Sequence, residues 1–267
     1  SLLYDALNAT TTNIRRYWST VELESNNEAG VKMILPSYGK LFSQLVVVAD
    51  GKDSAIRSDL GLTLRSVNYD QLGLVTNVST EVPHANTARQ WFSDSGILAF
   101  LPRHSKHECS VVFSVRNSLG RQILTWDLEA ISNFVTEISK GRLGKARLTS
   151  SPSFFDLSKG SVDSWFKGRC VLVGSSAHVL HPLARQGLNL SLMDAASLVE
   201  CMSLLNNSKS WPTLEQLNYY NRWRKSESQN MIAATDMLQK MFSINFFSIE
   251  KYFLIFFSIN FFFRSTF

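Results

Sequence analysis

The spacing of apolar residues along the chain predicts a mixture of helices and strands. Apolar positions three or four residues apart predict helices over residues 1–20, 54–60, 128–139, 187–205 and 214–242. Alternating or short continuous apolar runs predict strands over residues 21–24, 30–35, 45–49, 72–78, 88–92, 97–101, 109–115, 147–154 and 170–174. The helix over 187–205 is apolar on nearly every side, so we expect it to be buried all round.

The predicted strands are of two kinds, and their order predicts the domain organisation. Residues 45–49 and 170–174 are apolar without alternation, which is typical of parallel strands covered on both faces. From residue 69 to residue 114, turn residues separate strand-like runs, which favours a mixed or antiparallel sheet. We therefore predict an α/β fold with α+β character. Residues 1–65 and 155–242 form a parallel-sheet domain, and residues 66–154 form an inserted β-sheet domain.

The last part of the chain, residues 243–267, has a different composition. Phenylalanine fills much of it, and the sequence Phe-Ser-Ile-Asn-Phe-Phe occurs at 242–247 and again at 257–262. Glu250 and Lys251 interrupt the apolar run, which falls short of the ~20 residues that a membrane-spanning helix needs. We expect an aberrant or disordered tail here, and an anchor lying on a membrane surface is the alternative.

Composition and charge narrow the classes of function. The net charge is +5 and the isoelectric point is about 9.1, a modest excess that suits weak attraction to an anionic membrane surface. The chain has no basic run with interleaved aromatic residues, so we expect no nucleic-acid partner. Its three cysteines, Cys109, Cys170 and Cys201, show neither a CxxC pair nor metal-ligand spacing. This argues against a disulfide framework and a metal site, and for a reducing compartment.

A glycine turn after the strand at 170–174 is the strongest local signal of function. A strand that leads through such a turn to the start of a helix is how α/β proteins hold anionic cofactors. The turn Gly174-Ser175-Ser176-Ala177-His178 differs from a hydrolase nucleophile elbow, which needs glycine where His178 stands. His178 and His181 have no further ligand at metal-binding spacing, which favours loop or core histidines.

Two motifs together carry a resemblance to a known family. The first is Asp50-Gly51-x-x-Ser54-x-x-Arg57, which follows the strand at 45–49. The second runs from the glycine turn into the next helix, as Gly174-x-x-Ala177-His178-x-x-x-Pro182-x-x-x-Gln186-Gly187-x-Asn189-x-x-x-x-Asp194. In this order they resemble the motifs of the FAD-dependent aromatic hydroxylases, the p-hydroxybenzoate hydroxylase-like flavoproteins. The residues of the second motif are most similar to those of the family's ubiquinone-biosynthesis branch.

The resemblance implies an FAD cofactor and assigns the residues that hold it. The parallel-sheet domain would bind FAD and the inserted domain, 66–154, would bind substrate. Backbone N–H groups and a helix N-terminus stabilise the negative charge of reduced flavin, and glycine at Gly187 lets the backbone approach closely. No catalytic side-chain base is assigned. The implied cofactor-binding residues are Asp50, Gly51, Arg57, Gly174, Ser175, Pro182, Gln186, Gly187, Leu188 and Asn189.

The reaction implied by the resemblance is hydroxylation of a polyprenylated phenol. NAD(P)H would reduce the flavin, and O₂ would supply the oxygen atom. Such a protein would lie at the surface of the bacterial inner membrane on the cytoplasmic side, or on the matrix side of the mitochondrial inner membrane. Its expected partners are the phenol, O₂, the membrane surface and a complex of ubiquinone-synthesis proteins.

The chain also departs from the family's pattern. Ser175 stands where the family usually has Asp or Asn, Arg185 stands where glycine is usual, and Ser191 replaces a glycine. The chain has no G-x-G pair, so the dinucleotide-binding fingerprint that opens the family's sequences is absent from it. Two hypotheses follow from these differences. The first is that the chain is a fragment of an FAD-dependent monooxygenase. The second is that it is a non-catalytic remnant, or a membrane-associated degraded gene product, that is unable to bind FAD fully.

Overall fold

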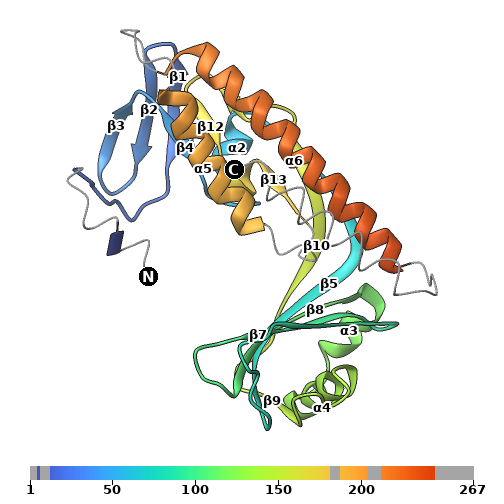
Figure 1. Cartoon of the computed structure of the whole chain (residues 1–267). Helices are drawn as coiled ribbons and strands as arrows, with labels where there is room; N and C mark the ends of the chain where they lie inside the picture. Colours follow the sequence, from blue (N-terminus) through green and yellow to red (C-terminus); the bar gives the residue numbers. More distant parts are fainter. Residues whose placement is uncertain (1–4, 7–12, 181–186, 204–211, 244–267) are drawn as a thin grey trace.

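The computed structural model describes residues 5–6, 13–180, 187–203 and 212–243, and they form an elongated molecule with two lobes (Figure 1). Each lobe has its own hydrophobic core. The first core gathers residues between Val31 and Leu60 with residues between Val162 and Tyr220. The second core lies entirely within residues 72–146. The domain boundaries at residues 66 and 154 stay a prediction, because one long strand, 64–80, runs through the first and another, 153–162, runs through the second.

The first lobe is built on a small sheet with the order β11-β12-β4. β12 (Cys170–Leu172) pairs in parallel with β4 (Val46–Val48), as the continuous apolar runs predict, and β11 (Phe166–Lys167) pairs antiparallel with β12. A separate antiparallel meander lies beside this sheet, and a short helix follows β4. These elements are β1 (Glu22–Asn27), β2 (Gly30–Leu35), β3 (Gly39–Ser43) and α2 (Ala55–Asp59).

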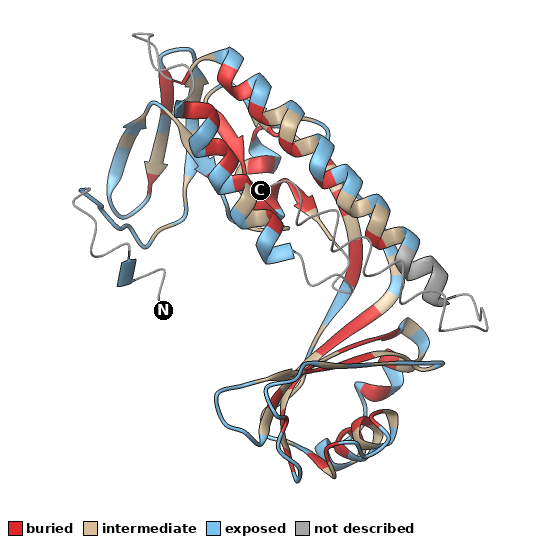
Figure 2. Cartoon of the chain, in the orientation of Figure 1, coloured by how far each residue is buried: buried red, intermediate tan, exposed pale blue. Residues whose placement is uncertain are grey.

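Two helices pack in the first lobe, and both have a buried and an exposed side (Figure 2). α5 (Gly187–Ser203) buries Leu190, Asp194 and Cys201. α6 (Leu214–Ser243) begins in the first lobe and runs past it along the connecting strands (Figure 1). Tyr220 of α6 donates a hydrogen bond from its hydroxyl to the carbonyl of Leu172, at 3.0 Å, which ties this helix to β12.

The second lobe is an antiparallel sheet with helices on one face. Its strand order is β13-β10-β5-β8-β7-β6, and β9 pairs with the far end of β5. Helices α3 and α4 cover one face, and α4 begins at an N-cap formed by Asp127. The bounds are β5 (Leu64–Thr80), β6 (Arg89–Ser93), β7 (Gly96–Pro102), β8 (Glu108–Arg116), α3 (Asn117–Ile123), α4 (Leu128–Ile138), β9 (Ala146–Leu148), β10 (Ser153–Val162) and β13 (His178–Val179).

Side chains alternate between the two faces of this sheet, and the register assigns each residue to one of them. One row across the strands joins Phe154, Leu74, Phe113, Leu98 and Trp91, and it packs in the core beneath the helices. The neighbouring row lies on the opposite face, which α3 and α4 leave uncovered. That row consists of Phe155, Gly73, Ser114, Ile97 and Phe92.

Some predictions from the sequence are wrong. Residues 13–20 are not helical; Ile14 and Trp18 are exposed, so a helix there would lack the packing that stabilises most helices. Residues 147–154 form parts of two strands, β9 and β10, because the chain turns at 149–152, where Pro152 has no N–H for a ladder. α5 is not buried all round, since Leu188 is 71% exposed, and β4 is not covered on both faces, since Val47 is 47% exposed.

Other predictions are confirmed, and some concern residues that the structure does not describe. The strands β1, β2, β6, β7 and β8, and the helices α2, α4, α5 and α6, lie close to their predicted bounds, whereas β5 begins eight residues before its predicted start at residue 72. β3, α3, β11, β13 and the long extension of β10 were not predicted. Residues 181–186 and 244–267 lie outside the described residues, and so do the predictions about Pro182, Arg185, Gln186 and the tail. Among the helices that the structure describes, none is long and apolar enough to cross a membrane.

Candidate functional site

Two glycine turns lie side by side in the first lobe because they follow neighbouring parallel strands. Gly51 follows β4 and Gly174 follows β12, with φ values of +94° and +60° that favour glycine. Val173 donates from its N–H to the carbonyl of Val48 at 3.0 Å, and the Ser176 hydroxyl donates to the same carbonyl at 2.7 Å. The carboxyl ends of the two parallel strands therefore present both turns at one edge, where α/β proteins bind ligands.

A buried arginine joins these two turns. Ser54 caps α2: its side chain accepts a hydrogen bond from the backbone N–H of Arg57 at 3.0 Å, which fixes the position of the Arg57 backbone. The Arg57 guanidinium donates to the carbonyl of Lys52 at 2.7 Å and to the carbonyl of Ser176 at 3.2 Å. Arg57 is 7% exposed, and its Nε is buried without a hydrogen-bond partner in the structure. It thus holds the two motifs together and keeps a positive charge beside both turns.

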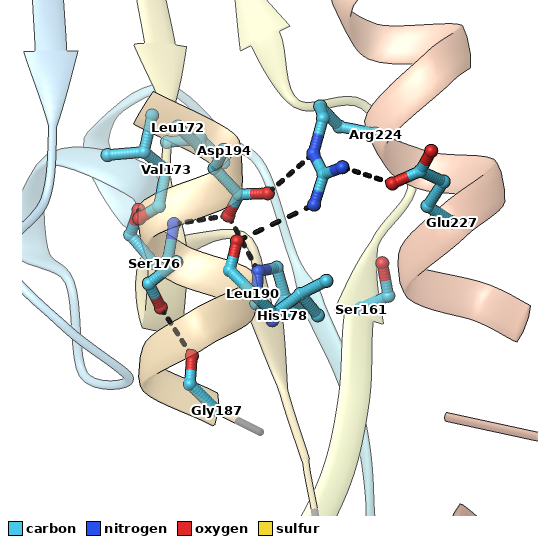
Figure 3. Close-up of polar contacts among 12 residues, drawn as sticks. Ser161, Leu172, Val173, Ser176, His178, Gly187, Leu190, Asp194, Arg224 and Glu227 are labelled. Atoms are coloured by element: carbon cyan, nitrogen blue, oxygen red, sulfur yellow. Dashed lines mark hydrogen bonds and ion pairs between the residues drawn. The ribbon is translucent and has the colours of Figure 1, made fainter. Parts of the chain in front are cut away.

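A buried carboxylate on α5 holds the Gly174 turn in place (Figure 3). Asp194 of α5 accepts hydrogen bonds through Oδ2 from the Gly174 N–H at 2.8 Å and from His178 Nε2 at 2.7 Å. Its Oδ1 accepts from Arg224 Nε at 2.8 Å, and Glu227 of α6 pairs with the other side of that guanidinium. Asp194, His178 and Arg224 are all buried, and each has its hydrogen-bonding partners within the core.

Aromatic rings complete this cluster. The Trp165 ring stacks on His178 with 5.2 Å between centroids, and Tyr220 meets Trp165 edge-on at 6.1 Å. Burial raises the pKa of Tyr220 far above its ordinary value, and the charge of Asp194 adds to this, so its hydroxyl stays a hydrogen-bond donor. His178 is therefore a core residue held by Asp194. Within the part of the chain that the structure describes, no group of His, Cys, Asp and Glu side chains could hold a metal ion.

The start of α5 lies against the same turn. A Cβ placed on Gly174 would come within 3.0 Å of the Ser191 hydroxyl oxygen, so the first turn of α5 packs on the glycine turn. Ser191 itself donates to the carbonyl of Gly187 at 2.8 Å. By contrast, a Cβ on Gly51 or on Gly187 would meet no atom of the described residues within 4 Å. Both glycines thus leave room for a ligand, Gly51 at its turn and Gly187 at the start of α5.

The structure brings together most of the site residues that the sequence predicts. Asp50, Gly51, Gly174 and Ser175 lie on the paired turns, and Asp50 and Ser175 are exposed. Gly187, Leu188 and Asn189 form the start of α5, and Arg57 lies between the turns. Pro182 and Gln186 lie outside the described residues. The roles of Asp194 and Arg224 were not predicted, although a lone carboxylate among the apolar positions of a helix signals a buried charge that needs a partner.

The turns, the helix N-terminus and the buried cation fit the flavin cofactor that the motifs imply. Open space at Gly51 and Gly187 lets backbone N–H groups come near a ligand, and α5 is long enough to direct a positive dipole end toward it. A polar hollow of about 390 Å³ lies next to the Gly51 turn. Its lining includes Lys52, Arg57 and Thr63.

Fold and site together define a cofactor-binding α/β protein with an inserted antiparallel sheet. Comparison with known proteins makes this specific: the chain belongs to the FAD binding domain family, whose model matches residues 2–235. It is 30% identical to the ubiquinone hydroxylase UbiL of Rhodospirillum rubrum over 80% of this chain and 50% of UbiL. It is 27% identical to the human mitochondrial ubiquinone biosynthesis monooxygenase COQ6, over 86% of this chain and 56% of COQ6.

A solved structure shows the same fold. PqsL, a probable FAD-dependent monooxygenase from Pseudomonas aeruginosa, superposes with a TM-score of 0.75 at 18% identity, over 91% of this chain and 69% of PqsL. The chain spans about half the length of the curated relatives it matches. The α/β fold class predicted from the sequence and the resemblance to flavoprotein hydroxylases of the ubiquinone branch are thereby confirmed.

Proposed function

We propose that this chain holds FAD at its paired glycine turns and serves an FAD-dependent monooxygenase that hydroxylates a polyprenylated phenol in ubiquinone biosynthesis. The observation that carries the proposal is the pairing of the Gly51 and Gly174 turns at the ends of adjacent parallel strands, joined by Arg57. Membership of the FAD binding domain family and similarity to ubiquinone hydroxylases support it.

The residues around the turns would hold different parts of FAD. Asp50 and Ser175 are exposed at the turns, where a carboxylate and a hydroxyl can hydrogen-bond the sugar-like chain of the cofactor. The backbone at Gly51 and the charge of Arg57 suit the pyrophosphate. The first residues of α5, beginning at Gly187, would lie beside the flavin ring, where the helix dipole favours negative charge.

Bound flavin would supply the transfer of electrons and of one oxygen atom, and the protein would supply position and electrostatics. The N-terminus of α5 would stabilise negative charge that develops near it. Asp194 keeps the Gly174 turn in place by accepting its N–H, and Arg224 neutralises Asp194 in the core. None of these side chains needs to act as an acid or a base.

The uncovered face of the inserted sheet suits an apolar substrate. It carries the row Phe155, Gly73, Ser114, Ile97 and Phe92, in which the Phe155 ring packs over Gly73. Phe155 and Phe92 are exposed, so this face presents apolar groups. Two residues further along these strands, Val75, Val112 and Ala99 form another row on the same face. β13 follows the Gly174 turn and pairs with β10 of this sheet, so the sheet is continuous with the candidate flavin site. An isoprenoid tail is the kind of group that such a surface binds.

We also propose NAD(P)H as the reductant and a membrane-surface location for the protein. The polar hollow beside Gly51 is lined by Lys52, whose charge suits a phosphate of a pyridine nucleotide, and by Asp53 and Thr63, which can hydrogen-bond its sugar. A polyprenylated substrate is dissolved in a membrane, and the net charge of +5 suits an anionic surface. The cytoplasmic face of a bacterial inner membrane and the matrix face of a mitochondrial one both meet this requirement. There the protein would join a complex of ubiquinone-synthesis proteins.

Isotope labelling tests the proposed reaction. The purified chain would be incubated with FAD, NADPH, a polyprenylated phenol in detergent and ¹⁸O₂, and the phenol would be analysed by mass spectrometry. The proposal predicts a product that contains one labelled oxygen atom. Heat-unfolded chain with the same free FAD is the control, because free reduced flavin consumes O₂ without the protein. A folded chain that binds FAD and yields no labelled phenol contradicts the proposal.

A further inference from the structure

The two lobes are connected by a ribbon of two strands that contains a bend. Near the first lobe, β5 pairs with β10 alone, and from Gln71 onward β5 also pairs with β8. Between these regions the ladder is interrupted: Asn68 pairs with Ser158 and Leu72 pairs with Asp156, so three β5 residues face one residue of β10. Asp70 in this bulge has a φ of +55°. Bulges bend strands and increase their twist, so the ribbon bends where the two lobes meet.

Polar side chains from three elements meet beside this bend. Asp236 of α6 accepts a hydrogen bond through Oδ1 from the Tyr69 hydroxyl at 3.2 Å. The same oxygen forms an ion pair with Lys159 Nζ, which lies 5.4 Å from the centre of the Tyr69 ring. The Lys159 and Asp236 side chains are only 22% and 16% exposed, so solvent screens the ion pair weakly. We call Tyr69, Lys159 and Asp236 the brace.

The brace connects the ribbon to the first lobe through α6. Tyr220 and Arg224 anchor α6 in the first core, through Leu172 and Asp194. Asp236 lies twelve residues beyond Arg224 on the same helix, a distance of about 18 Å at the rise of an α-helix. α6 therefore acts as a rigid arm that extends from the first lobe to the bend, as its course in Figure 1 shows. Tyr69 lies on the bulged strand and Lys159 lies on the strand opposite it.

We propose that the brace sets the angle between the two lobes and thereby positions the uncovered face of the inserted sheet relative to the paired glycine turns. Tyr69, Lys159 and Asp236 are positioning residues, since they lie beside the ribbon and act through it. The consequence for chemistry rests on the proposed function, because the angle sets the space between sheet and flavin. The consequence for shape does not rest on it, since the bend and the brace belong to the chain alone.

A distance measurement between the lobes tests the brace. The three native cysteines are buried, so spin labels can be attached selectively to cysteines introduced at exposed positions by Lys32→Cys in β2 and Glu129→Cys in α4. Electron–electron double resonance then reports the distance distribution between the lobes. We expect one narrow distribution in the parent protein. We expect Asp236→Asn and Lys159→Met each to lower the population at the parent distance, relative to all other distances, by about tenfold, because each breaks a partly buried ion pair.

Controls separate positioning from stability. Arg65→Gln removes an exposed ion pair with Asp163 on the same ribbon, at 2.6 Å, and should leave the distribution unchanged. Lys159→Arg keeps the charge and should retain most of the narrow distribution, and Tyr69→Phe removes only the hydroxyl and should broaden it less than Asp236→Asn. Circular dichroism confirms that each variant is folded. If the distribution in folded Asp236→Asn matches the parent, or if Arg65→Gln broadens it as much, the brace does not set the angle. The measurement uses no flavin, so its outcome is independent of the proposed reaction.

Discussion

Replacing Asp194 with asparagine should destabilise the first lobe strongly, because three donors converge on this carboxylate. Oδ2 accepts from the Gly174 N–H and from His178 Nε2, and Oδ1 accepts from Arg224 Nε. An asparagine amide has one acceptor oxygen and one NH₂ group. In either orientation its NH₂ faces a donor, namely the Gly174 N–H or the Arg224 Nε–H. The variant therefore loses at least one buried hydrogen bond, and Arg224 loses its buried ion-pair partner.

The expected loss of stability follows from the burial of these groups. A hydrogen bond to a charged group contributes about 1.5–3 kcal/mol, and an unpaired buried donor adds a further desolvation cost. Removing one partner of a buried ion pair destabilises proteins by about 3–5 kcal/mol. Glu227 still pairs with the guanidinium of Arg224, which offsets part of that loss. We expect Asp194→Asn to lower the free energy of unfolding by about 3 kcal/mol.

Urea unfolding followed by tryptophan fluorescence measures this effect, since Trp165 stacks on His178 in the affected core. Glu227→Gln is the matched control: it removes the other partner of Arg224, but the Glu227 side chain is 48% exposed, so the expected loss is under about 1 kcal/mol. Asp194→Asn combined with Arg224→Met should be less destabilising than the sum of the single changes. If Asp194→Asn costs no more than Glu227→Gln, the carboxylate does not hold the turn and the reasoning is refuted.

Further predictions concern the glycine turn and the buried thiols. Gly174→Ala should lower stability by about 1–2 kcal/mol in urea, because an alanine would adopt a φ near +60° and approach the Ser191 hydroxyl, and Ser191→Gly should recover part of the loss. Burial raises the pKa of Cys170 from 9.0 to about 11, so the folded chain holds this proton more tightly than the unfolded chain. The resulting stability is complete below pH 9 and is lost as the pH rises through 11; Cys170→Ala should therefore show a shallower loss over this range in melting experiments. Burial also raises the thiol pKa values of Cys109 and Cys201, so a thiol reagent at neutral pH should modify folded protein much more slowly than protein in urea, and equal rates would contradict this.

Much of the fold could be predicted from local sequence because its strands show clear periods. The antiparallel strands alternate between a face packed on helices and an uncovered face, and β4 and β12 are continuous apolar runs between turns. The errors arise where tertiary contacts, and not local sequence, determine whether a segment forms a helix or a strand. Residues 13–20 have helical spacing but pack little, and β13 is two residues long and exists only through its pairing with β10. The length of β5 likewise depends on which strands lie beside it.

The candidate site was predictable where single motifs determine it. Gly51 and Gly174 could be placed at the ends of parallel strands, and Gly187 at the start of a helix. The contact between Arg57 and Ser176 joins residues 119 positions apart, and no local pattern specifies it. The hydrogen bonds of Asp194 depend on how α5 and α6 cross, which the sequence does not determine by periodicity.

The space at Gly187 tests the central claim that FAD lies against the start of α5. Because a Cβ at Gly187 meets no atom within 4 Å among the residues that the structure describes, Gly187→Ala should leave the fold intact. Titration of the chain with FAD, followed by flavin fluorescence, would compare the parent with this variant. We expect saturable binding to the parent and at least about a tenfold weaker affinity for an equally stable Gly187→Ala protein, a difference of about 1.4 kcal/mol. Absence of binding to the folded parent, or equal affinity in the two proteins, would contradict the claim.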